Sequence, residues 1–191
     1  MTPEDPLARL LRWLGEARDQ QEPTAMALAT AGADGRPDAR MVLLKGADER
    51  GLRFFTNYES DKAAQLEANP YAALVAFWPS LHRQVRVRGP VERLPAAESD
   101  EYFSSRPRGS QLAAWASDQS RPLSGRDELD ERFAAFEREY QGGDIPRPEH
   151  WGGYRLAPDE WEFWTGRPNR LHDRERYRRR AGGWTLELLA P

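Results

Sequence analysis

The alternation of apolar and polar positions predicts a strand-rich first half of the chain. Short apolar blocks recur before residue 95, separated by glycine, proline or aspartate, and they predict strands at 25–31, 38–45, 52–56, 72–78 and 84–94. The nearly continuous apolar run at 72–78 predicts a buried strand. In the segment 84–94, Val85 and Val87 face one way and Gln84, Arg86 and Arg88 the other, and Gly89-Pro90 predicts a bend. Because the connections are short, we expect an antiparallel barrel or a tightly rolled sheet.

Helical periodicity appears at the start and in the middle of the chain. A helix is predicted within residues 1–20, where Asp5 and Pro6 provide a start signal and leucines form one apolar stripe. The segment 95–141 is predicted as a helical insertion with helices at 96–104, 109–117 and 128–140. The last of these helices has one apolar face, formed by Leu129, Phe133, Phe136 and Tyr140. Prolines and glycines between 146 and 153 predict a crossing loop.

Strand patterns return in the last third of the chain. We predict strands at 160–165, around Tyr177 and at 184–188. These C-terminal strands, within 159–191, are expected to complete the sheet that begins early. The predicted fold class is therefore mainly β with helices (α+β), with residues 1–191 forming a single domain.

The stretch from Arg40 to Lys62 predicts a hairpin followed by a short helix at 61–69, with Ser60 as the N-cap. Thr56, Ser60 and Lys62 would meet at the strand-to-helix turn, where free backbone N–H groups suit a phosphate dianion. An ordinary amphipathic hairpin with solvated cations explains the pattern equally well. Arg40 and Lys45 are five residues apart, so they share a face only if the strand twists, bulges or ends before Lys45.

Composition excludes several classes of function. The net charge of −3 argues against general nucleic-acid binding, and the absence of cysteine excludes disulfides and thiolate chemistry. Three scattered histidines make a metal site improbable. We find no signal peptide and no apolar run long enough to span a bilayer, so we expect a cytoplasmic protein without membrane partners.

Three further clusters could carry chemistry. Tyr102 and Arg106 are four residues apart and precede Ser110, which suits a second phosphate site, although a capped helix–loop–helix corner is the simpler interpretation. Adjacent Gln119 and Ser120 offer hydrogen bonds from a loop, where a loop cap is the alternative. Cation-capable groups also occupy alternate positions after a turn, and if this stretch is extended they point the same way: Arg170, His172 and Arg174.

Taken together, these segments resemble the pyridoxamine 5′-phosphate oxidase family. The resemblance runs from about Asp5 to Pro191, and its most specific motifs are Arg-Met-Val-Leu-Leu-Lys at 40–45, Ser-Arg-Pro-Arg-Gly-Ser at 105–110, Trp-Gly-Gly-Tyr at 151–154 and Arg-Leu-His-Asp-Arg at 170–174. It implies a split β-barrel homodimer with two FMN sites between the subunits. Phe55 stands where the family commonly has tyrosine, and Asp61 where it commonly has a cation.

The resemblance also implies residue roles. It implies FMN contacts from Arg40, Met41, Val42, Leu43, Leu44, Lys45, Phe55, Thr56, Lys62, Gln84, Gln119, Ser120, Trp164 and Arg174. It implies that the substrate phosphate is bound by Lys45, Tyr102, Arg106 and Ser110. Arg170 and His172 would lie over the substrate ring as the catalytic pair, with Arg170 fixing and polarising the substrate and His172 adding a hydrogen bond.

The implied reaction oxidises pyridoxamine 5′-phosphate, and also pyridoxine 5′-phosphate, to pyridoxal 5′-phosphate. A hydride passes from the substrate C4′ carbon to flavin N5, the resulting imine hydrolyses, and dioxygen reoxidises the flavin to give hydrogen peroxide. Two alternatives stay open: a related flavin oxidase acting on another compound, such as a phenazine precursor, and a non-catalytic binder of FMN or pyridoxal phosphate. The presence of Lys45, Arg106 and Ser110 favours the vitamin B6 phosphate.

Overall fold

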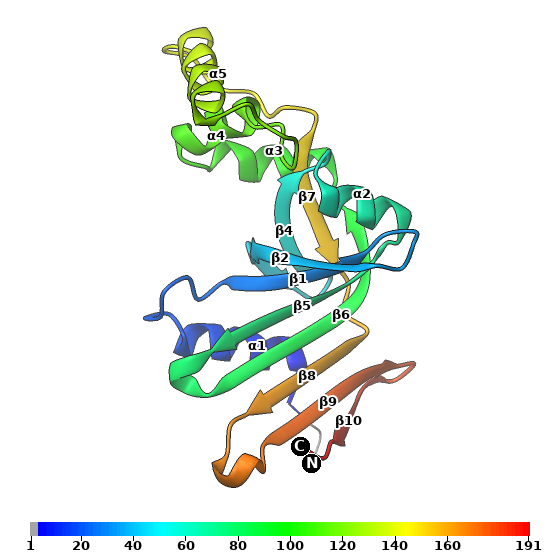
Figure 1. Ribbon diagram of the computed structural model, residues 1–191. Coiled ribbons are helices and arrows are strands. Elements are labelled where there is room, and N and C mark those ends of the chain that lie inside the picture. The colour runs from blue at the N-terminus through cyan, green and yellow to red at the C-terminus, as the bar shows by residue number, and fades with distance from the viewer. Residues whose placement is uncertain (1–3) are drawn as a thin grey trace.

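The strands form a strongly curled antiparallel sheet that carries the helical segment at one end (Figure 1). The computed structural model describes residues 4–191. The main path of the 10-stranded sheet runs β10-β9-β8-β6-β5-β1-β2, while β7 joins β6 to β4 and β4 pairs with β3. The strands are β1 Ala25–Ala31, β2 Pro37–Leu43, β3 Gly46–Asp48, β4 Gly51–Asn57, β5 Tyr71–Trp78, β6 Arg83–Arg93, β7 Trp151–Leu156, β8 Glu160–Thr165, β9 Asp173–Arg180 and β10 Gly183–Leu188.

Within residues 4–191, five α-helices and two short 3-10 helices accompany the sheet. Helix α1 packs against the curled sheet, and α3, α4 and α5 stand together beyond the ends of β4 and β7 (Figure 1). The helices are α1 Pro6–Glu16, α2 Asp61–Ala68, α3 Ala96–Ser104, α4 Arg108–Ala116 and α5 Arg126–Glu139, with 3-10 turns η1 Pro79–Leu81 and η2 Pro168–Arg170. None of the helices in the part of the chain that the structure describes is long and apolar enough to cross a membrane.

The curl of the sheet originates in β6, which pairs with different neighbours along its length. Residues 83–88 pair with β8, whereas Val91 to Arg93 pair with β7. The change occurs at Gly89-Pro90, the point at which the sequence predicts a bend. Gly89 is required there because a Cβ atom would collide with the carbonyl oxygen of Ala157.

Two apolar cores hold the structure together. The main core lies inside the curled sheet, where Trp13 of α1 packs edge-on against Phe163 of β8 with ring centroids 5.1 Å apart. A second core lies in the helical segment and contains Phe103, Leu112 and Trp151. The predicted apolar face of α5 packs there through Phe133, Phe136 and Tyr140. This second core fixes α3 and α4 beside β4 and β7, which is where the functional site forms.

Three details of the strand prediction were wrong. Residues 40–57 do not form one hairpin, because β2 pairs with β1 while β4 pairs with the short strand β3 inside the expected connector. The segment predicted as a crossing loop includes the first three residues of β7, a strand whose six residues are all buried. The apolar block at 72–78 is not buried throughout, since the side chain of Phe77 is 53% exposed on the outer face.

Helix positions are confirmed, with shifted ends. Helix α1 stops at Glu16 rather than about Gln20, because Ala17 closes it as the C-cap. Ser60 is the N-cap residue of α2, as predicted, but its side chain donates to the Asn57 carbonyl and makes no capping bond. Helix α3 ends at Ser104, so Tyr102 and Arg106 do not share a helix face.

Candidate functional site

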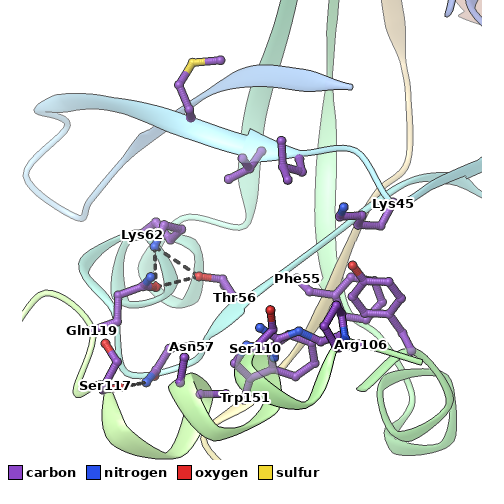
Figure 2. A pocket seen from close by; sticks show the side chains of 17 residues that line it. Lys45, Phe55, Thr56, Asn57, Lys62, Arg106, Ser110, Ser117, Gln119 and Trp151 are labelled. Carbon is purple, nitrogen blue, oxygen red and sulfur yellow. Dashed lines mark hydrogen bonds between the residues drawn. The ribbon is translucent and has the colours of Figure 1, made fainter. Parts of the chain in front are cut away.

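A cavity of about 580 Å³ lies between the end of β2, strand β4, the start of α2 and helices α3 and α4. Figure 2 shows Lys62 and Gln119 at one end of this cavity and Lys45 and Arg106 at the other. Many of the predicted site residues line it: Met41, Val42, Leu43, Lys45, Phe55, Thr56, Lys62, Tyr102, Arg106, Ser110 and Gln119. The cavity therefore has two cationic ends with an apolar middle.

Lys62 defines the first end. Its Nζ donates to Gln119 Oε1 at 2.8 Å, Thr56 Oγ1 at 3.1 Å and Ser60 Oγ at 3.2 Å. The side chain is buried, and desolvation together with the nearby charge of Arg40 lowers the pKa of Lys62 to about 8. The predicted contact of Lys62 with Thr56 and Ser60 at the strand-to-helix turn is confirmed. A bound anion would stabilise the charged form of this desolvated ammonium.

Residues beside the Lys62 end complete its surroundings without lining the cavity. Arg40 faces the same region from β2, but its guanidinium is already held by Asp38, Thr30 and Gln65. Ser120 accepts a hydrogen bond of 3.3 Å from the backbone N–H of Asp61, the first residue of α2.

The end of β2 resolves the question of how Arg40 and Lys45 reach one site. The strand stops at Leu43, and Leu44 turns into the core with 6% exposure. Lys45 is exposed and lines the cavity. The sequence left three alternatives open, namely a twist, a bulge or an end of the strand before Lys45. The structure shows the third.

Arg106 defines the second end. Its guanidinium makes no hydrogen bond or ion pair with the rest of residues 4–191, and its buried Nη1 has no partner there. Burial lowers the pKa of Arg106, which shows how poorly the cation is compensated in the free protein. Tyr102, Ser110 and Lys45 line the same part of the cavity. A half-buried, unpaired guanidinium in a cavity wall is a strong donor for an oxyanion.

The remaining predicted residues gather in another part of the chain. Gln84 lies opposite Trp164 across β6 and β8, and Trp164 lies opposite Arg174 across β8 and β9. The rings of Trp164 and His172 are 4.6 Å apart. None of these residues, nor Arg170, lines the cavity of their own chain.

The expectation that residues 170–174 form one extended stretch was wrong. Pro168–Arg170 form a 3-10 turn in which Asn169 and Arg170 have left-handed backbones, with φ of 58° and 61°. His172 Nδ1 accepts from the backbone N–H of Arg167 at 3.1 Å, and Arg174 donates to buried Glu162 at 2.9 Å. Arg170 is exposed at the surface. Glycine-like backbone angles at these positions carry no clear signal in the sequence.

Sequence reasoning missed part of the cavity wall. Two of the lining residues that were missed are Trp151 and Asn57. Trp151 lies in the Trp-Gly-Gly-Tyr motif, to which no role was assigned, and Asn57 is the residue after Thr56. Four further residues come from helix α4 and its approaches: Pro107, Ala113, Ala114 and Ser117. Among the described residues, no group of three or more acidic, histidine or cysteine side chains is placed to hold a metal ion.

The curled sheet and this cavity define the class of protein as a split barrel with a pocket for a ligand bearing anionic groups. Family models agree with this class. Residues 14–139 match the model described as pyridoxamine 5′-phosphate oxidase, and residues 151–191 match the pyridoxine 5′-phosphate oxidase C-terminal dimerisation region. The chain belongs to the pyridoxamine 5′-phosphate oxidase family.

Individual relatives support the same conclusion. The chain is 58% identical to a pyridoxine/pyridoxamine 5′-phosphate oxidase of Salinibacter ruber, over 98% of this chain and 90% of the relative. It is 56% identical to one of Burkholderia multivorans, over 98% and 89%.

Two solved structures extend the comparison. PhzG from Burkholderia lata 383, solved with tetrahydrophenazine-1-carboxylic acid, has a TM-score of 0.93 and 34% identity over 100% of this chain and 94% of that one. A related FMN binding protein from Nostoc punctiforme, with a TM-score of 0.80 and 20% identity over 100% of both chains, shares the fold. The predicted α+β split-barrel fold is confirmed.

Proposed function

We propose that this protein is an FMN-dependent oxidase that converts pyridoxamine 5′-phosphate, and also pyridoxine 5′-phosphate, to pyridoxal 5′-phosphate, with dioxygen reduced to hydrogen peroxide. The observation that carries this proposal is the pairing of two cationic ends within one cavity, Lys62 at one and the unpaired Arg106 at the other. One suits the phosphate of the cofactor and the other the phosphate of the substrate. The close relatives, which carry the names of such oxidases, support the same reaction.

The Lys62 end fits the FMN phosphate. Its ammonium is desolvated and accompanied by Thr56 and Gln119, and α2 begins beside it at Asp61. Residues Met41, Val42 and Leu43 of β2 line the cavity between its two ends, where a planar ring system would lie along the strand. When bound there, FMN supplies the electron acceptor for the C4′ hydride and the route for reoxidation by dioxygen.

The Arg106 end would hold the substrate. Its guanidinium and the Lys45 ammonium would bind the phosphate as cations, and Ser110 and Tyr102 would add hydroxyl hydrogen bonds. Anchoring the phosphate at this end fixes the distance of the reacting carbon from the other end of the cavity. The chain thereby contributes binding and orientation to the reaction.

A second copy of the chain would complete each site. Gln84, Trp164, Arg170, His172 and Arg174 lie outside the cavity of their own chain, so we assign them to the cavity of the partner in a homodimer. This assignment is supported by the match of residues 151–191 to a dimerisation region. FMN would then sit between subunits, with Arg170 fixing and polarising the substrate and His172 adding a hydrogen bond. We further propose that the whole chain acts as one domain, in the cytoplasm.

A flavin oxidase acting on a phenazine precursor is the second candidate, favoured by the similarity to PhzG. Arg106 alone does not separate the two, because the phenazine compound carries a carboxylate that a guanidinium would also bind. The combination of Arg106 with Lys45 and Ser110 favours the substrate with a phosphate, because a dianion gains from two cations and a hydroxyl group at the same end.

The test is to load the purified protein with FMN and incubate it in air with each substrate in turn. Pyridoxamine 5′-phosphate should give pyridoxal 5′-phosphate and hydrogen peroxide in equal amounts. Tetrahydrophenazine-1-carboxylic acid should give much less turnover per unit of enzyme. A preference for the phenazine compound would favour the second candidate, and no turnover of either would favour a non-catalytic binder.

A further inference from the structure

We propose that Trp151 is the positioning residue of the phosphate-binding end: its indole face holds the guanidinium of Arg106 in place while no anion is bound. This inference rests on the proposed function, because it assigns Trp151 a part in recognising the substrate phosphate. Trp151 opens strand β7, far in sequence from helix α3 and Arg106.

The first observation is that Arg106 lacks polar partners. Within residues 4–191 its guanidinium forms no ion pair or hydrogen bond, and Nη1 is buried without a partner. A cation in such a position costs free energy unless some other group stabilises it. The groups against it are aromatic faces, with Cζ 4.5 Å from the Trp151 ring centroid and 5.5 Å from that of Phe103. Trp151 is the nearer ring and the better cation–π partner.

The second observation is that the Trp151 ring is held on several sides. Its side chain is 7% exposed, and its ring stacks on Phe55 with centroids 5.5 Å apart and planes 11° apart. Tyr102 lies nearly parallel at 6.2 Å. The backbone is fixed as well, since Trp151 N–H donates to the Pro148 carbonyl at 3.0 Å.

The neighbouring glycines make this stack possible. A Cβ atom on Gly153 would lie 2.7 Å from Cε1 of Phe55 and would also collide with Leu94. One on Gly152 would collide with the hydroxyl of Tyr58. The Trp-Gly-Gly sequence thus places a large flat ring beside two positions that need to be small.

The consequence concerns the direction of the Arg106 donors. A guanidinium that lies against an aromatic face uses its flat side for that contact and keeps its N–H edge free. The donors other than the buried Nη1 therefore stay available for phosphate oxygens without paired groups having to separate first. Such preorganisation improves affinity by reducing the ordering cost of binding.

The effect should appear in binding of the phosphate and much less in the chemical step. Loss of the ring is expected to raise KM for pyridoxamine 5′-phosphate by about fivefold to thirtyfold, which corresponds to about 1–2 kcal/mol at 1.4 kcal/mol per tenfold. A direct contact between Trp151 and the substrate ring would instead weaken phosphorylated and unphosphorylated substrates alike.

The experiment compares Trp151→Phe and Trp151→Leu with the wild type. For each FMN-loaded protein, KM and kcat are measured with pyridoxamine 5′-phosphate and with pyridoxamine, and calorimetry gives Kd for pyridoxal 5′-phosphate and for pyridoxal. The matched control is Trp115→Phe, since Trp115 packs in the same core against Phe136 but does not touch Arg106. Bound FMN is measured by its absorbance relative to protein.

We expect the Trp151→Leu variant to lose affinity for the two phosphorylated compounds only, while its kcat changes less than twofold. The affinity of the Trp151→Phe variant for the phosphorylated compounds should lie between those of the wild type and Trp151→Leu. Equal losses for phosphorylated and unphosphorylated compounds, or no loss, would overturn the inference. If Trp151→Leu fails to fold, the same comparison within Trp151→Phe decides. In an Arg106→Met background the Trp151→Phe change should have almost no further effect on phosphate affinity. Additive losses there would contradict action through Arg106.

The calorimetric measurements keep the inference separate from the proposed function. If the wild type binds pyridoxal 5′-phosphate but turns over no substrate, the proposed oxidase activity fails while the comparison of Trp151 variants still decides the inference. If the wild type turns over and the Trp151 variants bind the phosphate as well as it does, the inference fails alone.

Discussion

Replacement of Arg106 by methionine removes the cation at the phosphate end and keeps an unbranched apolar stem in its place. Because the guanidinium has no polar partner in the free protein, the change breaks no ion pair or hydrogen bond within the described chain. It also removes a desolvated charge, whose burial lowers the pKa of Arg106. Loss of the contact with the Trp151 ring opposes this gain, so the melting temperature of the substrate-free protein should change little.

The magnitude of the functional loss follows from the contact that is lost. A charge-assisted hydrogen bond contributes about 1.5–3 kcal/mol, which at 1.4 kcal/mol per tenfold is about a 10-fold to 150-fold rise in KM for pyridoxamine 5′-phosphate. Bound FMN should be retained, because Lys62 and its partners lie at the other end of the cavity.

The assay is steady-state oxidation of pyridoxamine 5′-phosphate, with flavin content measured on the same preparation. Arg108→Met is the matched control, because Arg108 is exposed and bonds to the carbonyls of Tyr140 and Gly143 outside the cavity. An Arg106→Met enzyme with the KM of the wild type would refute the assignment of the substrate phosphate to this end. So would a loss of FMN with unchanged KM.

Three further predictions follow from the same contacts. Burial lowers the pKa of Lys62 to about 8 in the free protein, and a phosphate dianion stabilises its protonated form. The affinity for FMN should therefore fall about tenfold between pH 7 and pH 9. A fluorescence titration of FMN should show this pH dependence, and the Lys62→Met variant should lose it. Gly153→Ala should lower the free energy of unfolding by about 1–3 kcal/mol in urea denaturation because its Cβ would collide with Phe55, whereas Gly109→Ala, which meets nothing within 4 Å, should not destabilise. Arg170→Ala should lower kcat more than it weakens FMN binding, and loss of FMN alone would contradict the role assigned to Arg170.

Much of the fold could be predicted because it depends on local patterns. The strands at 25–31 and 160–165 and the helix at 96–104 have the predicted bounds, since alternation and helix-start signals lie within each segment. The single-domain organisation stays a prediction.

Strand β7 could not be predicted because its sequence signals a loop. Gly152 and Gly153 break an ordinary strand pattern, yet here the missing side chains leave room for Tyr58 and Phe55. The reason for these glycines lies in residues almost a hundred positions earlier in the chain. A local pattern contains no such information.

The two ends of the cavity also differ in how far they could be predicted from the sequence. Thr56, Ser60 and Lys62 are close in sequence, so their meeting could be inferred from a strand-to-helix turn, and the structure confirms it. The contact of Arg106 with Trp151 joins distant segments and could not be inferred. The roles predicted for Arg170, His172 and Arg174 stay predictions, since these side chains lie outside the cavity of their own chain.

The most direct test of the account is to add pyridoxamine 5′-phosphate to the FMN-loaded protein in the absence of oxygen and record the flavin absorbance. The account predicts a yellow protein that is bleached by one equivalent of substrate and regains its colour when air is admitted. A protein that binds FMN but keeps its full yellow absorbance with excess pyridoxamine 5′-phosphate would contradict it.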